Sequence, residues 1–292
     1  HLEKNGVPAE PRSWRTHGIA VGGLVLCVLF AWHLYRSAAP TDRIVRKYYQ
    51  NYGFYPEEKR GGATVRWTEK RAYAAARAAG NLVEFDLIAA QENSSGREGL
   101  GVTIAIGDSV RDVVHFFNGG AKRLQYYLPA LRGKEIVIRT EVSETFKPKG
   151  PGMSPDFRNL GIARGEIAFS DTLPEDGVGF FAAETAGGEK PFTFRWTGSR
   201  ASVAAKNIAG KKLQLLCAHP DIRVNPVTVR VVIEDRLLWE REVTDNGWQD
   251  VVIDAKEFAD GGVVTFQASR TWNPRAMGVS EDTRDLGVAV RW

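Results

Sequence analysis

Residues 143–164 read SETFKPKGPGMSPDFRNLGIAR, and residues 269–291 read SRTWNPRAMGVSEDTRDLGVAVR. Aligned without a gap at an offset of 126 (269 − 143), the two stretches agree at ten of the twenty-one positions from 143 to 163. A gap-free match of this extent indicates an internal duplication, which is a stronger guide to a fold than any local pattern. The identical pairs are Ser143/Ser269, Thr145/Thr271, Pro148/Pro274, Gly152/Gly278, Ser154/Ser280, Asp156/Asp282, Arg158/Arg284, Leu160/Leu286, Gly161/Gly287 and Ala163/Ala289.

The duplication extends upstream of these two loops. The recurring segments are GFY (53–55) with GFF (179–181), RWT (66–68) with RWT (195–197), and Arg71-Ala72 with Arg200-Ala201. The first pair keeps the offset of 126 and the others have an offset of 129, so loop insertions compensate one another between the two ends.

The repeat divides most of the chain into two modules of similar length. We expect module one at residues 53–169 and module two at residues 179–292, each of ordinary domain size. A hinge at 170–178 would join them, inside the acidic and glycine-rich stretch 170–191.

Both modules carry the pattern of β-strands. Short segments rich in Val, Ile, Leu and aromatic residues are separated by Gly, Asn, Asp or Pro. Seven or eight strands in about 110 residues predict a mainly β chain with two tandem antiparallel β-sandwiches of jelly-roll or immunoglobulin-like type. The expected strands are 65–67, 82–89, 102–106, 113–117, 122–127, 135–142 and 160–163 in module one, and 192–196, 212–218, 227–233, 237–243, 249–253, 263–269 and 286–290 in module two.

The N-terminal part of the chain predicts a membrane anchor. A polar arm at 1–17 precedes Gly18–Tyr35, which is apolar apart from His33 and, at ~1.5 Å per residue, is just long enough for a transmembrane helix. Residues 36–52 would form a membrane-proximal connector. A signal peptide cleaved after Ala39 is the alternative, although Arg36 beside that site argues against it.

The predicted helix carries small residues that suit close packing against another helix. Gly18 and Gly22 form a small-xxx-small pair, with Gly23 beside them, although such pairs also occur by accident. We expect a single-pass protein of a bacterial inner membrane, in contact with the lipid bilayer, with periplasmic β modules. The basic residues on the two sides of the segment are nearly balanced and do not fix this orientation.

The composition argues against a nucleic-acid-binding protein. Thirty-nine basic and 35 acidic residues give a net charge of +4, and the basic residues are scattered rather than clustered. Cys27 lies in the apolar N-terminal segment and Cys217 in an expected strand, so both are interpreted as buried thiols rather than as a disulfide.

The sequence contains no motif that is typical of an active site. The five histidines are isolated, and neither a nucleophile elbow nor a phosphate-binding loop occurs. We therefore expect a protein that is not an enzyme and that binds no cofactor or metal ion. A pair of carboxylates brought together from different strands is the alternative that a sequence leaves open.

The repeated loop contains an Asp-x-Arg motif in both copies, at Asp156/Arg158 and Asp282/Arg284. We expect the Asp carboxylate to cap the turn while the guanidinium reaches backbone carbonyls. Ligand binding by the pair is the alternative. The aromatic residues Trp67, Trp196, Trp272 and Phe146 are expected in the sandwich cores rather than on a sugar-binding platform.

These residues carry a resemblance to a known family. The segment GFYP at 53–56, the RWT motif and TWNPRAMGVSEDTRDLGVAV at 271–290 resemble the C-terminal β-sandwich module of some bacterial membrane glycosyltransferases and polysaccharide-assembly proteins. The resemblance implies a non-catalytic module of the bacterial envelope. The multi-span catalytic portion of such enzymes is absent from this sequence, so their activity does not carry over.

Two functions fit these expectations. The first is an accessory subunit, in which one span docks into an integral membrane protein complex, such as a photosynthetic, respiratory or transport assembly, and the β modules brace its exposed side. The second is a carbohydrate-binding protein of the cell envelope, with a glycan as partner. A protein partner would contact aromatic and arginine residues that differ between the copies. The candidates are Phe116, Phe117, Tyr126 and Tyr127 in module one and Arg236, Trp239 and Trp248 in module two.

Overall fold

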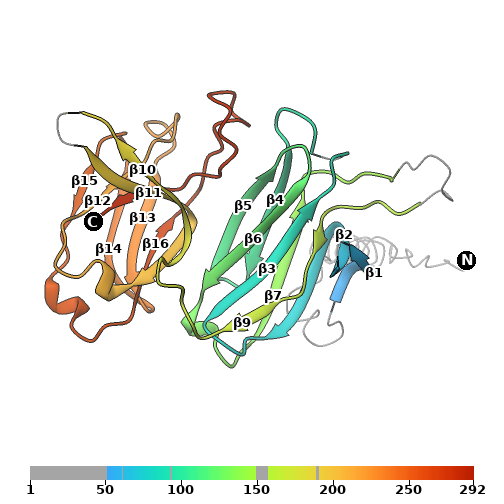
Figure 1. The fold of residues 1–292 in the computed structure, drawn as a ribbon, viewed down its shortest axis with the longest axis horizontal. Coiled ribbons are helices and arrows are strands. Elements are labelled where there is room, and N and C mark those ends of the chain that lie inside the picture. The colour runs from blue at the N-terminus through green and yellow to red at the C-terminus, as the bar shows by residue number, and fades with distance from the viewer. Residues whose placement is uncertain (1–50, 61, 93, 149–156, 189–190) are drawn as a thin grey trace, which may run out of the picture. The chain divides into compact units, whose positions relative to one another are not determined.

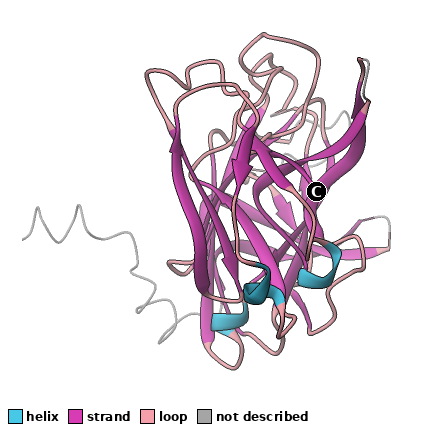
Figure 2. Ribbon diagram, turned by 90° about the vertical axis from the view of Figure 1, so that its left-hand side faces the viewer, coloured by secondary structure: helices cyan, strands magenta, loops and turns pink. Residues whose placement is uncertain are grey.

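The computed structural model describes residues 51–60, 62–92, 94–148, 157–188 and 191–292. In these residues the chain is mainly β, with two sheets in which every strand pair is antiparallel. Helical structure in the same residues is limited to short 3₁₀ turns (Figure 2). The turns are Pro129–Leu131, Ala205–Asn207 and Ala255–Phe258. The predicted mainly β, antiparallel class is therefore confirmed.

The sheet of module one follows the strand order β5-β4-β7-β2-β8-β3-β6, with β1 paired to β2 and β9 to β3 (Figure 1). Strands at the two ends of this path contribute to one hydrophobic core, as Val114 of β5 and Tyr126 of β6 show, so the sheet folds around its own core. The strands are β1 (Asn51–Arg60), β2 (Ala63–Arg77), β3 (Leu82–Ala89), β4 (Leu100–Ile106), β5 (Val110–Phe116), β6 (Gly120–Tyr127), β7 (Glu135–Val142), β8 (Ala163–Arg164) and β9 (Ala168–Ser170).

The sheet of module two follows the order β14-β13-β16-β11-β17-β12-β15, with β10 paired to β11. Adding nine to each strand number of module one, β9 excepted, reproduces this order, as a duplication requires. The strands are β10 (Val178–Ala186), β11 (Phe192–Ala204), β12 (Leu213–Leu216), β13 (Val227–Ile233), β14 (Arg236–Val243), β15 (Gln249–Val251), β16 (Val263–Ala268) and β17 (Ala289–Arg291).

A glycine at a strand irregularity explains the first repeated motif. Gly53 (φ 72°) and Gly179 (φ 76°) lie where the pairing of β1 with β2 and of β10 with β11 shifts register. A Cβ at Gly53 would lie 2.2 Å from the Arg71 carbonyl oxygen, and one at Gly179 would lie 2.1 Å from that of Arg200. Only glycine meets both demands, a positive φ and a close backbone approach.

A threonine and a glycine explain two further repeated motifs. The Thr68 Oγ1 accepts a hydrogen bond from the Ile162 amide at 3.0 Å, and the Thr197 Oγ1 accepts one from the Val288 amide at 3.1 Å. The glycines of the two Leu-Gly pairs donate their amides to the same threonines' carbonyls, at 2.7 Å in module one and 2.8 Å in module two. These bonds fasten the end of each repeated loop to the long strand, β2 or β11.

Most expected strands are present, and three, 82–89, 135–142 and 227–233, have the observed bounds. The expected hinge at 170–178 corresponds to residues 171–177, which contain no strand, whereas β10 occupies residues 178–186 of the wider stretch 170–191. The first long strand is also underestimated: β2 runs over fifteen residues rather than 65–67. No helix among the described residues is long and apolar enough to cross a membrane, and the predicted segment Gly18–Tyr35, with Gly18, Gly22 and Gly23, lies outside them.

Candidate functional site

The arginine of each repeated loop binds a glutamate of the first strand of its own module. Arg158 Nη1 donates to Glu58 Oε1 at 2.5 Å, and Arg284 Nη1 donates to Glu184 Oε1 at the same distance. The two glutamates are themselves 126 residues apart (184 − 58), so an extension of the GFY and GFF alignment by three positions would have found them. This signal was available in the sequence and was missed.

The Asp-x-Arg motif of module two caps its turn. Asp282 Oδ1 accepts from the Arg284 amide at 2.9 Å, and its carboxylate also binds the Arg284 guanidinium, which lies over the Phe181 ring. The guanidinium is thus held by carboxylates and not by the expected backbone carbonyls. This pairing lowers the pKa of Asp282 and raises the pKa of Arg284. Asp156 of module one lies outside the described residues.

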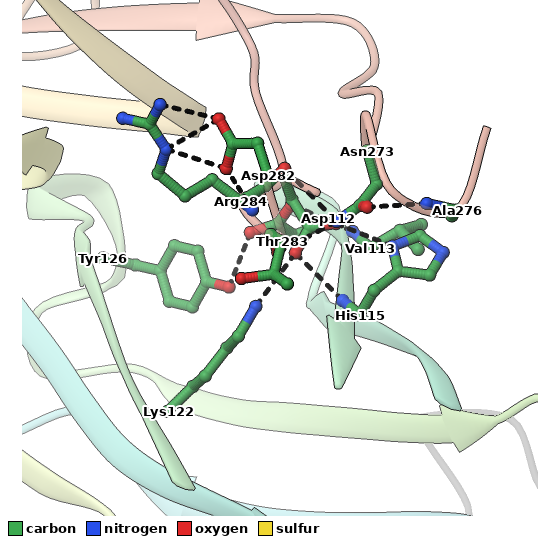
Figure 3. A network of polar contacts seen from close by, with 11 residues as sticks. Asp112, Val113, His115, Lys122, Tyr126, Asn273, Ala276, Asp282, Thr283 and Arg284 are labelled. Atoms are coloured by element: carbon green, nitrogen blue, oxygen red, sulfur yellow. Dashed lines mark hydrogen bonds and ion pairs between the residues drawn. The ribbon is translucent and has the colours of Figure 1, made fainter. Parts of the chain in front are cut away.

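Asp285, the residue after Arg284, joins module two to module one, and Figure 3 shows three residues that bind it, His115, Lys122 and Asn273. Its carboxylate, 6% exposed, accepts from the amide and Nδ1 of His115 at 2.9 and 2.6 Å and from Lys122 Nζ at 3.3 Å. Asn273 of its own module donates to the same carboxylate at 3.0 Å. Because His115 lies on β5 and Lys122 on β6, one buried carboxylate ties the repeated loop of module two to two strands of module one.

A second carboxylate lies in the same network. Tyr126 donates its hydroxyl to Asp112 Oδ2 at 2.9 Å, and Ser199 of module two also binds this carboxyl. Loss of hydration, together with the charge of Asp285, raises the pKa of Asp112, and burial also raises the pKa of Tyr126. The junction therefore contains two carboxylic acids, Asp112 of β5 and Asp285 of the loop before β17, which resembles the pair of carboxylates that the sequence left open.

Other contacts extend the junction on both sides of Asp285. Arg275 of the repeated loop lies over the Phe117 ring, 5.0 Å from its centroid. Tyr127 donates its hydroxyl to Glu234 Oε2 at 3.0 Å, and burial raises the pKa of this tyrosine above its usual range.

The aromatic residues that were expected to contact a partner occupy different environments. Phe116, Tyr126 and Tyr127 are 2%, 3% and 6% exposed, so the expectation that they face an outside partner is wrong. Phe116 lies in the core of module one because the inward side of β5 requires an apolar residue there. The two tyrosines, with half-buried Phe117, contribute to the junction between the modules instead.

The three candidates of module two are more accessible. Arg236 is exposed and pairs with Glu257, and half-buried Trp239 packs against the core of its module. Trp248 is half-buried in an aromatic cluster with Phe192 and Phe194, with ring centroids 5.6 and 5.8 Å from its own.

This aromatic cluster differs sharply from the equivalent surface of module one. The guanidinium carbon of Arg291 lies 4.0 Å from the centroid of the Phe192 ring and 5.0 Å from that of the Trp248 ring. The Arg291 Nε donates a hydrogen bond to Gln214. Equivalent strand pairings place small residues at the matching positions of module one. The matching pairs are Ala63/Phe192, Val65/Phe194, Ala121/Trp248 and Gly165/Arg291.

The predicted core aromatics and the remaining thiol have clear places in the fold. Trp67 and Trp196 are buried, whereas Phe146 and Trp272 are partly buried against them. Cys217 is a buried free thiol whose pKa burial raises to about 12, which makes it a poor nucleophile.

The hydrogen bonds of the two junction carboxylates favour a role in attaching the modules to each other. Asp285 accepts four hydrogen bonds from protein donors, and Asp112 accepts from Tyr126, Ser199 and its neighbour's amide. Carboxylates held in this way are positioned to link strands. Within the described part of the chain, no group of three or more His, Cys, Asp or Glu side chains could hold a metal ion.

Comparison with known proteins identifies no family for this chain. No family model and no curated protein matches the chain. Among solved structures, the tandem CBM22-1–CBM22-2 domain of Paenibacillus barcinonensis Xyn10C is 9% identical, over 82% of this chain and 87% of that one, with a TM-score of 0.23. The M60 catalytic domain with the CBM51-1 and CBM51-2 domains of Clostridium perfringens ZmpB is 10% identical, over 80% of this chain and 34% of that one, with a TM-score of 0.22.

A third similar structure is a plant receptor-like kinase, FER, at 8% identity over 82% of this chain and 86% of that one, with a TM-score of 0.24. TM-scores of this size do not establish a common fold. No property of these proteins is therefore carried over to this chain.

Proposed function

We propose that this chain is a non-catalytic accessory subunit of a bacterial membrane assembly, anchored by Gly18–Tyr35, whose two β modules brace the exposed side of a protein partner. The observation that carries the proposal is the carboxylate of Asp285, which fastens module two to module one through His115 and Lys122. A brace must hold its two contact surfaces at a fixed separation, and this junction supplies that restraint.

The sequence difference at the junction supports this function. The position that matches Asp285 in module one is Asn159, so the linking carboxylate belongs to one copy alone. Two modules in a fixed arrangement present both surfaces at once, which raises the effective concentration of the second contact after the first has formed. Loosening the junction should therefore weaken binding to a partner that spans both modules.

The test uses the full chain in its native membrane, solubilised in mild detergent and separated by native electrophoresis. We expect the wild-type chain to migrate with a large assembly, and Asp285→Asn to reduce that fraction while the chain remains folded. The matched control is Asn159→Asp at the equivalent position of module one, which should leave migration unchanged. A wild-type chain that migrates alone, or equal migration of all three chains, would contradict the proposal.

The second candidate function is binding of a glycan by module two. The aromatic cluster of Phe192, Phe194 and Trp248 favours it, because aromatic faces beside hydrogen-bonding side chains suit the apolar faces and hydroxyls of sugar rings. Arg291, Gln214 and Asp250 are linked by hydrogen bonds at the same place.

Affinity electrophoresis through gels that contain bacterial polysaccharides separates the two candidates. Glycan binding predicts that the chain is retarded and that Trp248→Ala abolishes the retardation. Trp239→Ala is the control, because it removes a half-buried tryptophan of the same module at a different place; thermal melting must show that both variants fold. If no polysaccharide retards the wild-type chain, the glycan function is wrong.

A further inference from the structure

The two modules differ in one cross-strand charge pair. In module one, Arg71 of β2 lies opposite Glu141 of β7 and donates to both of its carboxylate oxygens, Nε at 3.1 Å and Nη2 at 2.7 Å. This bidentate pairing raises the pKa of Arg71 and lowers the pKa of Glu141. Such a fork is the geometry in which a guanidinium binds a carboxylate best.

Module two keeps the arginine and lacks the carboxylate. Arg200 of β11 is the repeat of Arg71, and the residue opposite it on β16 is Gln267, at the position equivalent to Glu141 (141 + 126). The side chain of Arg200 forms no hydrogen bond or ion pair with any described residue, and its buried Nε has no hydrogen-bond partner. Burial lowers the pKa of Arg200 to about 10, and the negative charge of Asp235 offsets only part of this shift.

Arg200 lies in the wall of two cavities at the junction of the modules. One, of about 390 Å³, is lined by Lys122, Arg123 and Arg284 in addition to Arg200, against two acids, Asp112 and Asp285. The other, of about 420 Å³, has two basic and four acidic side chains in its lining. Three of the bases in the first cavity already have carboxylate partners: Lys122 pairs with Asp285, Arg123 with Glu84, and Arg284 with Asp282 and Glu184. Arg200 is the described lining base without one, and the four acids of the second cavity disfavour an anion there, so the first cavity is the better place for an anion that pairs with Arg200.

The first cavity also offers contacts to the rest of a ligand. Phe180, Phe181 and Tyr126 supply aromatic surface, and Gln125 and Thr283 supply hydrogen-bonding groups. Aromatic surface beside a few polar groups is typical of small-molecule sites, and the volume lies within their ordinary range.

We propose that the cavity walled by Arg200 and Lys122 binds a small organic acid of the size of a hexuronate, whose carboxylate pairs with the Arg200 guanidinium as Glu141 pairs with Arg71. Arg200 is half-buried and its Nε is a buried donor without a hydrogen-bond partner, which is unfavourable; a ligand carboxylate would supply the charged acceptor that Gln267 does not. This inference is independent of the membrane anchor and of either proposed function.

Thermal melting and isothermal titration of the full chain test the site at constant ionic strength. The probes are glucuronate, propionate, inorganic phosphate and, as the neutral ring control, glucose. We expect glucuronate at about ten times its Kd to raise the Tm by roughly 3–6 °C and glucose to have no effect. Stabilisation by propionate as well would support the carboxylate site. Equal stabilisation by glucose, or stabilisation by phosphate alone, would overturn it.

Two variants and one control locate the binding. Arg200→Gln should reduce glucuronate affinity at least tenfold. Gln267→Glu should do the same while raising the Tm without ligand, because it supplies the missing carboxylate internally. Arg71→Gln, at the matching position of module one, should leave the affinity unchanged. The proposal is overturned if no carboxylate binds the wild-type chain, or if Gln267→Glu retains full affinity.

Discussion

The two modules share the residues that build their sheets and differ in the residues that contact other surfaces. Gly53 and Gly179 occupy the same irregularity, and Thr68 and Thr197 accept equivalent hydrogen bonds. By contrast, Asn159 is replaced by the buried Asp285. A duplicated chain therefore contains its own control: positions that agree report on the fold, and positions that differ report on the contacts acquired since duplication.

The largest loss of stability is expected from the removal of Asp285. Asp285→Ala leaves His115 and Lys122 without their carboxylate, and breaking a buried charged pair costs about 3–5 kcal/mol. Asn159→Ala should cost less than about 1 kcal/mol, in the range of ordinary surface changes. Urea unfolding measures both, and hydrogen exchange should show the largest loss of protection in β5, β6 and the loop before β17. Equal costs at the two positions would contradict the proposed role of the junction.

Substituting a shared glycine should instead damage either module in the same way. Gly179→Ala and Gly53→Ala each place a Cβ about 2 Å from a carbonyl oxygen at positive φ, so we expect a loss of about 2–4 kcal/mol in both modules. Gly210→Ala is the control, because Gly210 has a φ of 72° and an added Cβ there would have no atom within 4 Å; it should cost about 1 kcal/mol. The free energies of unfolding of the three variants, measured in urea, separate the cost of steric overlap from the cost of backbone strain. Similar costs for all three variants would show that the overlap is unimportant.

The same comparison shows what the sequence could predict. Strands such as 82–89 and 227–233 alternate or concentrate apolar residues over several positions, and that local signal suffices to locate them. β1 and β10 were missed because glycines, charged residues and alanines obscure the period, and their pairing with the long strands comes from tertiary contact.

Side-chain environments at the junction were less predictable. Phe116 and Tyr126 were both expected at an external interface, because a pattern of differing aromatics does not tell which side of a strand meets the other module. The Glu58/Glu184 pair was present in the alignment, as was the Glu141/Gln267 difference. The missing partner of Arg200 becomes visible only when the register of β11 and β16 is known.

An acidic pH should destabilise module two through His219. This side chain is fully buried, and burial, with the charge of Arg270, lowers its pKa to about 4. The unfolded state binds a proton near pH 6.5 and the folded state does not, so stability is complete above pH 6.5 and falls as the pH decreases toward 4. We expect a loss of about 2 kcal/mol between pH 7 and pH 5 from this residue.

The variant His219→Gln isolates that contribution. Counting on from the matched residues Ile88 and Leu216, the equivalent position of module one is Gln91, so the substitution makes the modules alike there. The free energy of unfolding of the variant should depend less on pH between 7 and 5 than that of the wild-type chain. An unchanged pH dependence would show that His219 is protonated in the folded state.

The smallest expected effect concerns the glutamates that bind the loop arginines. The Arg158–Glu58 and Arg284–Glu184 side chains are about one third exposed, so solvent screens both pairs. Glu58→Gln and Glu184→Gln should each cost at most about 1 kcal/mol, and a double-mutant cycle with Arg→Met should give a coupling that decreases at high salt. Because both modules have this pair, the two cycles should agree. A much larger coupling in module two would mean that Glu184 and Arg284 belong to the junction, together with Asp285, rather than to the duplicated scaffold.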